Sequence, residues 1–242
     1  MKFILVIIFL FSSYTVQCKD IDLHIVTEDW PPFIINKSEV SGVVTNKVKE
    51  ILKYTDIEYV IDVYPWARSF HIATTTPNTL IYSIYRTKQR EKQFHWFCPI
   101  HQSTSVHAYK LASNDINIDS IKYLRTAVVG VMRGDNSHSY FLQHGFKDGV
   151  NLDVSSNEEI NLKKLVMGRV DAVVQSKESL DYRLESLGVK NVKLVSGLVI
   201  AENKNAEHKN AEHCMALSLG TKPEIINKIS KGFKLWQQAQ KE

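Results

Sequence analysis

Residues 58–85 read EYVIDVYPWARSFHIATTTPNTLIYSIY, and this stretch decides the fold class. Glu58–Tyr64 has the β-rich composition of a strand. Pro65 suits the first turn of a helix, which we expect to run to about Thr74. The apolar run Thr79–Tyr85 predicts a second strand. The order strand, helix, strand is typical of an α/β fold with mostly parallel strands.

The same alternation extends in both directions and forms two series, the second of which begins after about Val106. In one predicted helix, Ser156 and Glu159 fit a capping box. No Gly/Ser/Pro-rich linker separates the two series, which favours two closely joined lobes over a flexible tether. The other expected strands are 21–26, 94–97, 126–131, 170–175 and 192–196, and the other expected helices are 44–52, 87–92, 137–143, 156–167, 179–187 and 224–238.

Residues 1–18 have the pattern of a secretory signal peptide. Lys2 precedes the apolar run Phe3–Phe11, which is well below the ~20 residues needed to span a bilayer. We expect cleavage after Cys18. We do not expect lipid anchoring at Cys18, because Gln17 is bulkier than such sites usually accept. The sequence therefore predicts a protein exported to the periplasm.

Composition excludes several classes of protein. The 30 Lys and Arg against 26 Asp and Glu give a net charge of +4, which is too small a bias for a nucleic-acid-binding face. The 44% hydrophobic and 23% charged residues exclude a disordered chain. The nine histidines lack metal-ligand spacing and no phosphate-binding fingerprint is present, so we expect no metal and no cofactor. Whether Cys98 and Cys214 pair is left open.

Candidate binding residues follow the predicted strands, at the end where ligands of open α/β sheets usually lie. Trp30 and Trp66 can stack on a ligand, or can simply cap the core. Arg68 and Arg90 can each offer a guanidinium fork to a carboxylate, or can be solvated surface residues. In the turn Gly130–Ser137, a strand and a glycine turn precede a helix start whose free N–H groups can hold an anion.

These pieces, in this order, resemble the extracellular solute-binding proteins of family 3, the amino-acid-type periplasmic receptors of ABC importers. The resemblance covers essentially all of residues 20–242. It rests on Trp30-Pro31-Pro32-Phe33, Ser41-Gly42, Pro65-Trp66-Ala67-Arg68, Thr87-Lys88-Gln89-Arg90-Glu91, Phe94-His95-Trp96-Phe97-Cys98-Pro99-Ile100, Gly130-Val131-Met132-Arg133-Gly134 and Gly168-Arg169-Val170-Asp171-Ala172.

The resemblance implies a two-lobed, type II periplasmic-binding-protein-like fold, in which each lobe is a mixed sheet flanked by helices. After the signal peptide, 1–18, the first lobe comprises 19–107 and 213–242, and the second comprises 108–212. Two crossovers, near Val106–Lys110 and Cys214–Leu217, form a hinge, so that the lobes close on a small solute. We interpret the tandem repeat Lys204–His208 and Lys209–His213 as a duplication in an exposed loop.

The family also implies roles for individual residues. Trp66 and Trp30 stack on the solute, and Ser83 meets its amino group. Arg90 pairs with its α-carboxylate, and the turn at Asp135 and Asn136 closes on the same carboxylate.

Three positions depart from the family pattern. Ser176 stands where an acidic residue usually holds the ligand's ammonium, and Asp135 stands where a small hydroxyl residue is usual. Tyr85 replaces another small hydroxyl residue. Because a buried ammonium without a carboxylate costs several kcal/mol, a plain α-amino acid is an unexpected ligand. Asp135 facing Arg90 is a candidate interlobe ion pair.

The leading hypothesis is a non-enzymatic, monomeric protein that passes a small polar or carboxylate-bearing solute to the permease of an ABC importer. A ligand-sensing module for a membrane receptor is the first alternative. A periplasmic dehydratase-like enzyme is the second, with Glu28 or Asp135 as general acid.

Overall fold

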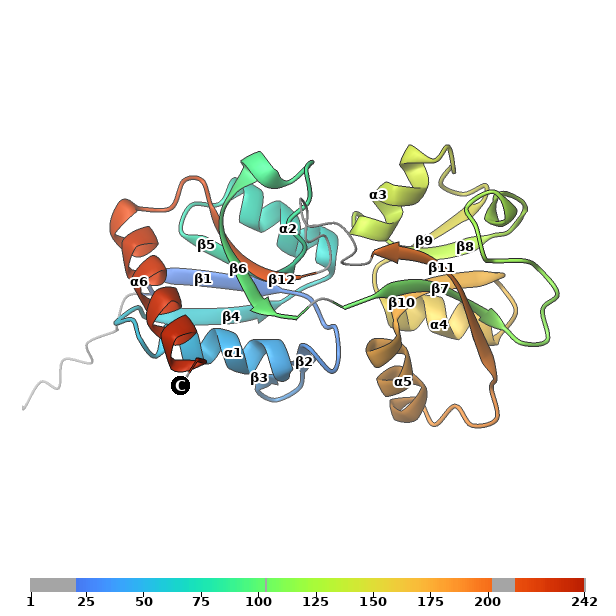
Figure 1. Ribbon diagram of the computed structural model, residues 1–242, viewed down its shortest axis with the longest axis horizontal. Coiled ribbons are helices and arrows are strands. Elements are labelled where there is room, and N and C mark those ends of the chain that lie inside the picture. The colour runs from blue at the N-terminus through green and yellow to red at the C-terminus, as the bar shows by residue number, and fades with distance from the viewer. Residues whose placement is uncertain (1–20, 103, 202–211, 242) are drawn as a thin grey trace, which may run out of the picture.

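The computed structural model describes residues 21–102, 104–201 and 212–241. The predicted signal peptide and most of the tandem repeat lie outside these residues. The chain forms two lobes, each built on a five-stranded sheet (Figure 1). No helix in the described part of the chain is long and apolar enough to cross a membrane.

The first lobe has the strand order β4-β1-β5-β12-β6. In Figure 1, helices α1 and α6 lie on one side of this sheet and α2 lies on the other. The elements of this lobe are β1 (Leu23–Thr27), β2 (Ile35–Asn36), β3 (Val40–Ser41), α1 (Val43–Leu52), β4 (Tyr59–Val63), α2 (Trp66–Thr75), β5 (Thr79–Ile84), the 3-10 turn η1 (Glu91–Gln93), β6 (Phe94–His101), β12 (His213–Ser218) and α6 (Pro223–Ala239).

The second lobe has the strand order β11-β7-β10-β8-β9. Helix α4 packs against β8 and β10, and α5 directly follows β10. The elements of this lobe are β7 (Val106–Leu111), the 3-10 turn η2 (Tyr123–Thr126), β8 (Val129–Met132), α3 (Asn136–Gln143), β9 (Leu152–Ser155), α4 (Glu158–Val166), β10 (Ala172–Ser176), α5 (Lys177–Ser186) and β11 (Leu194–Ala201).

Both sheets are mixed, which confirms the predicted fold class. In the first sheet β1 is parallel to β4 and β5, while β12 is antiparallel to β5 and β6. In the second sheet β8 is parallel to β9 and β10, while β7 is antiparallel to β10 and β11. The expectation of mostly parallel strands was therefore wrong for half of the pairings, because one strand in each sheet, β12 in the first and β7 in the second, runs opposite to the other four and lies between two of them.

The burial pattern explains why these segments form these elements. Val44, Val48, Ile51 and Leu52 recur with helical spacing, and all four are buried on the inner face of α1. All six residues of β5 are buried, as expected for a central strand covered on both faces.

One predicted helix start was misplaced. Asn157 caps α4, since its side-chain oxygen accepts a hydrogen bond from the backbone N–H of Ile160 at 2.9 Å. The capping box at Ser156 is therefore not formed. Asn and Ser are comparably good caps, so local sequence does not distinguish two adjacent candidates.

The chain passes from the first sheet to the second between His101 and Val106, and returns between Ala201 and His213. The segments expected to cross, Val106–Lys110 and Cys214–Leu217, lie within β7 and β12. Each is paired inside one sheet, so the connections between the lobes precede them.

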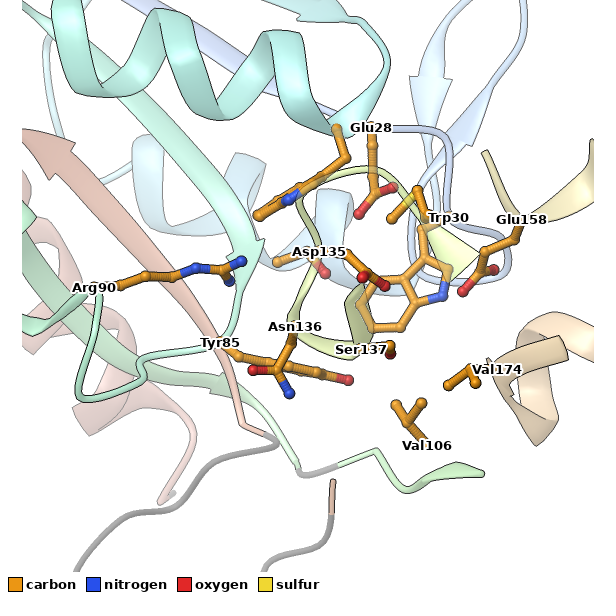
Figure 2. A pocket seen from close by; sticks show the side chains of 13 residues that line it. Glu28, Trp30, Tyr85, Arg90, Val106, Asp135, Asn136, Ser137, Glu158 and Val174 are labelled. Carbon is orange, nitrogen blue, oxygen red and sulfur yellow. The ribbon is translucent and has the colours of Figure 1, made fainter. Parts of the chain in front are cut away.

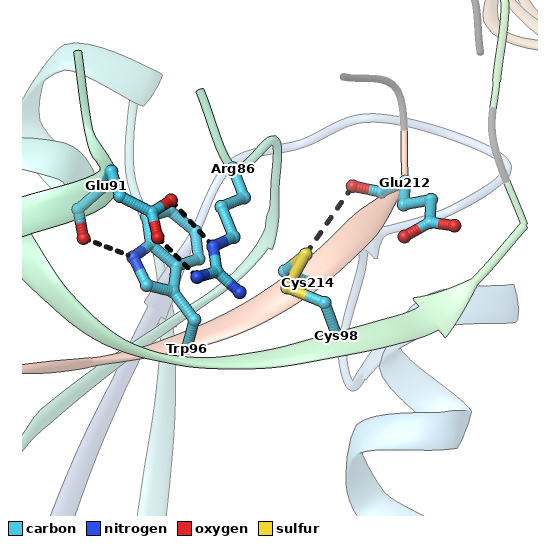
Figure 3. Close-up of a disulfide and its surroundings, with 6 residues drawn as sticks. All are labelled: Arg86, Glu91, Trp96, Cys98, Glu212 and Cys214. Carbon is cyan, nitrogen blue, oxygen red and sulfur yellow. Dashed lines mark hydrogen bonds and ion pairs between the residues drawn. A yellow bond between two sulfur atoms is a disulfide. The ribbon is translucent and has the colours of Figure 1, made fainter. Parts of the chain in front are cut away.

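Cys98 and Cys214 form a disulfide that links β6 to β12 (Figure 3). The two strands are antiparallel neighbours in the sheet, which brings together cysteines 116 residues apart in sequence. The pairing left open by the sequence is thus present, close to the point where β12 enters the first lobe.

Candidate functional site

A cavity of about 50 Å³ lies between the two lobes (Figure 2). It brings together seven of the nine residues named from the sequence. The walls are formed by Glu28, Trp30, Trp66, Ser83, Tyr85 and Arg90 from the first lobe, and by Val106, Met132, Asp135, Asn136, Ser137, Glu158 and Val174 from the second.

Strand direction explains why these residues converge. Glu28 directly follows β1, Trp66 begins α2 just after β4, and Tyr85 directly follows β5. The three strands are parallel, so their carboxyl ends meet at one edge of the sheet. The turn after β8 brings Asp135 to the same gap from the other lobe.

Trp66 and Arg90 reach across the gap to the second lobe. The Trp66 indole Nε1 donates a hydrogen bond to the Gly134 carbonyl at 2.8 Å, and Arg90 Nη2 donates to the same oxygen at 3.3 Å. Arg90 Cζ lies 5.1 Å from the ring centroids of both Trp66 and Phe70. Burial lowers the pKa of Arg90 to about 10, so its guanidinium stays charged at neutral pH.

Three acidic side chains line the same cavity, of which Glu28 and Glu158 are buried and Asp135 is half-buried. Burial is the main cause that raises the pKa of Glu28, Asp135 and Glu158, and it raises the pKa of Asp135 to about 6. Asp135 accepts a hydrogen bond from the His138 backbone N–H at 2.6 Å. In Figure 2, Arg90 and Glu158 lie at opposite ends of the group of labelled side chains, and the Asp135 carboxyl group lies between them.

Glu158 and Glu28 differ in their surroundings. Glu158 accepts a hydrogen bond from Ser179 Oγ at 2.7 Å and lies 3.6 Å from Arg183 Nε. The carboxyl group of Glu28 makes no hydrogen bond or ion pair with another residue of the described chain. Its nearly complete burial without a partner leaves a carboxyl group ready to accept hydrogen bonds from a ligand.

Two further polar groups of the walls lack partners. Trp30 Nε1 and the Tyr85 hydroxyl are buried and form no hydrogen bond with described residues. A buried donor without an acceptor costs about 1–3 kcal/mol. A bound solute or ordered water that supplies the acceptors would remove this cost.

A second cavity of about 200 Å³ adjoins the first, and Glu28 and Trp66 line both. It also spans the lobes, since Arg183 Nη2 donates a hydrogen bond to the Asp29 carbonyl at 2.9 Å across the gap. The remaining lining residues are Asn36, Val63, Tyr64, Pro65, Ser156, Asn157 and Glu159.

Two of the residues named from the sequence lie outside the first cavity. Arg68 stacks its guanidinium on the Tyr64 ring, with Cζ 4.2 Å from the centroid. Ser176 is fully buried and caps α5, because its hydroxyl accepts a hydrogen bond from the Ser179 backbone N–H at 3.2 Å. Neither side chain lines the cavity, since Arg68 packs beside β4 and Ser176 caps α5.

The sequence analysis missed Glu158 and named Glu28 only as a candidate acid of an enzyme. Their position in the sequence could have indicated them. Glu28 directly follows β1 and Glu158 comes shortly after β9, and both strands end at the gap between the lobes. No group of three His, Cys, Asp or Glu side chains within the described ranges is arranged to hold a metal ion.

Comparison with solved structures identifies the architecture. A histidine kinase sensor domain similar to periplasmic binding proteins superposes with a TM-score of 0.76 at 16% identity, over 90% of this chain and 91% of that one. An ancestral arginine-binding protein bound to arginine gives 0.72 at 20% identity, over 89% and 92%. An arginine 3rd transport system periplasmic binding protein from Legionella pneumophila gives 0.70 at 18% identity, over 92% and 95%.

No protein-family model matches the sequence, and no curated protein matches it. The likeness is therefore one of three-dimensional structure. At these identities it shows that the chain has the two-lobed fold of periplasmic binding proteins.

Proposed function

We propose that the protein is a non-enzymatic solute-binding protein that encloses a small zwitterionic solute between its lobes. The observation that carries the proposal is that the interlobe cavity is lined by one buried cation and by acid groups, one of which lies at the end opposite the cation. Arg90 stands at one end as a buried cation, and Glu28 and Glu158 supply carboxyl groups on the other side. A solute with an acidic and a basic group matches both ends.

The acidic residue missing at Ser176 has a substitute in this arrangement. Glu28 contributes a carboxyl group from the first lobe, and Glu158 contributes one from the second. A buried ammonium needs such a partner, because leaving it unpaired costs several kcal/mol. The sequence-based objection to an amino-acid-like solute therefore loses its main support.

The second cavity offers room for a solute that is longer than the first cavity. The first cavity, at about 50 Å³, suits the zwitterionic head of the solute. The adjoining 200 Å³ offers room beyond Glu28, where Arg183 lies 3.7 Å from the Asp29 carboxylate and 3.5 Å from that of Glu159. Two of the structural neighbours are described as arginine-binding or arginine-transport proteins, so basic amino acids are the first solutes to test.

Several broader features belong to the same proposal. The two lobes follow the two sheets, so that the second lobe begins with β7 at Val106, and the connections between the sheets act as the hinge. The protein works as a monomer in the periplasm after removal of a signal peptide, and it presents the closed form to the permease of an ABC importer. It needs no cofactor.

Solute sensing is the second candidate function. The observation that favours it is the likeness to a histidine kinase sensor domain. Deletion of the gene distinguishes the import function from the sensing function. If the protein is an importer component, the cell needs it to take up the radiolabelled solute. A sensor leaves uptake unchanged and removes the response to that solute.

The binding test is calorimetric titration of the purified protein with arginine, ornithine, glutamate and agmatine, the last of which lacks a carboxylate. We expect arginine or ornithine to bind best. Arg90→Gln should weaken this binding by about 10–100-fold, the worth of a charge-assisted hydrogen bond, but should barely affect agmatine. Glu28→Gln should weaken the two basic amino acids and agmatine alike.

Two matched controls lie outside the cavity. Arg86→Gln breaks an ion pair with Glu91, and Glu39→Gln breaks one with Lys49. Both controls should bind like the unmodified protein. Unchanged arginine affinity in Arg90→Gln would remove Arg90 from the site, and preferred binding of glutamate would reject the basic solute.

A further inference from the structure

His213 occupies an unexpected place at the junction of the lobes. It is the first residue of β12, where the chain returns from the second lobe, and its side chain is fully buried. Its Nδ1 lies 2.6 Å from Ser83 Oγ, and its Nε2 lies 2.8 Å from Thr104 Oγ1. Thr104 belongs to the connection between β6 and β7, so this one ring contacts that interlobe connection and the cavity wall at Ser83.

The ring also supports an aromatic wall of the cavity. It stacks on Trp30 with centroids 5.0 Å apart and planes at 17°, and it lies 4.7 Å from the Phe33 centroid. Trp30 and Ser83 both line the cavity, whereas His213 and Thr104 do not. His213 is therefore placed directly behind two residues that face the solute.

Burial, together with the positive field of His101 and Lys47, lowers the pKa of His213 to about 3, so the ring is neutral. A neutral imidazole carries one N–H, and its other nitrogen accepts. If Nε2 holds the proton it donates to Thr104, and Ser83 must donate its hydroxyl proton to Nδ1. Ser83 then offers only lone pairs to the solute. If Nδ1 holds the proton, Ser83 accepts it and offers its own proton to the solute.

We propose that His213 is a positioning residue that links the β6–β7 connection between the lobes to the solute site through a Thr104–His213–Ser83 hydrogen-bond relay. The relay fixes whether Ser83 accepts or donates toward the solute. This inference rests on the proposed solute-binding function. Because Glu28 and Glu158 select for a hydrogen-donating solute group, the matching state has the proton on Nε2 and Ser83 as an acceptor.

The test uses Thr104→Val, which removes the hydroxyl at the far end of the relay without altering the cavity wall. Without Thr104 the Nε2 proton has no acceptor, so we expect it to move to Nδ1 and turn Ser83 into a donor. The affinity for arginine should fall by roughly fivefold, the factor associated with one neutral hydrogen bond. Thr104→Ser keeps the hydroxyl and should restore the original affinity.

The tautomer is read independently from the ¹⁵N chemical shifts of His213 in solute-free protein. The relay predicts Nε2–H in the unmodified protein and in Thr104→Ser, and Nδ1–H in Thr104→Val. In a Ser83→Ala background, Thr104→Val should cause no further loss of affinity. The relay would be overturned if Thr104→Val lowered the affinity equally in the Ser83 and the Ser83→Ala backgrounds. An Nδ1–H tautomer in the unmodified protein would overturn it as well.

The two proposals fail in different ways. If no basic amino acid binds the unmodified protein, the proposed function fails, and the ¹⁵N shifts still decide whether the Thr104–His213–Ser83 relay exists. If arginine binds but Thr104→Val keeps the Nε2–H tautomer and full affinity, the relay fails and the binding function stands.

Discussion

The Trp66→Phe substitution tests whether hydrogen bonds across the gap hold the lobes together. Trp66 belongs to the first lobe, and its Nε1 donates at 2.8 Å to the carbonyl of Gly134 in the second. Phenylalanine keeps an aromatic face for Arg90, whose Cζ lies 5.1 Å from the Trp66 ring, but it has no N–H to donate. The substitution therefore removes one interlobe hydrogen bond and leaves the aromatic wall largely in place.

The expected effect follows from what remains at Gly134. Its carbonyl keeps the longer hydrogen bond from Arg90 Nη2 at 3.3 Å, so it is not left without a donor. The loss should therefore match the ordinary net contribution of a neutral hydrogen bond, about 1 kcal/mol. This corresponds to about a fivefold fall in the ratio of closed to open protein.

The assay is fluorescence energy transfer between one label on each lobe, measured without solute and over a solute titration. Trp96→Phe is the matched control, because Trp96 Nε1 donates to the Glu91 carbonyl at 2.9 Å within the first lobe (Figure 3). Both variants should lose some thermal stability, but only Trp66→Phe should shift the lobe equilibrium. Equal shifts in the two variants, or none in Trp66→Phe, would refute the reasoning.

Three further predictions concern pH, an interlobe cation and the disulfide. Burial raises the pKa of Asp135 to about 6, so the stability it confers is full below the usual pKa of about 4 and is lost as pH rises through 6. Asp135→Asn, which can still cap α3, should reduce the dependence of the melting temperature on pH over this range, while Glu28 and Glu158, whose pKa values are also raised, keep their share. An unchanged profile would contradict the assignment. Arg183→Lys removes the hydrogen bond from Nη2 to the Asp29 carbonyl and should weaken closure by up to about 2 kcal/mol in the energy-transfer assay; unaltered closure would show that Arg183 does not join the lobes. Replacing Cys98 and Cys214 with Ser should lower the free energy of unfolding by about 2–5 kcal/mol in denaturant titrations, and an identical midpoint would argue against the bond.

Local sequence was sufficient for most of the fold. The spacing of Val44, Val48 and Ile51 specifies a helix face whatever it packs against, and β5 is a continuous apolar run. Trp30 and Trp66 were placed near the cavity because side chains that follow parallel strands gather at one edge. These inferences depend only on short-range pattern and on strand direction.

The remaining features depend on contacts between distant segments. Glu28 and Glu158 meet only when two lobes approach each other, and no spacing in the sequence encodes that approach. His213 ends a repeat of polar appearance, yet strand pairing with β6 buries it completely. Arg68 resembled a ligand-binding arginine, but a neighbouring tyrosine ring, Tyr64, holds it outside the cavity.

The most direct test of the account is a crystal structure of the protein with its best-binding basic amino acid. The account predicts electron density for the solute between the lobes, with its carboxylate on Arg90 and an amino group within hydrogen-bond distance of Glu28 or Glu158. Density for the solute outside the interlobe cavity, or a bound solute that contacts neither Arg90 nor these carboxyl groups, would contradict it.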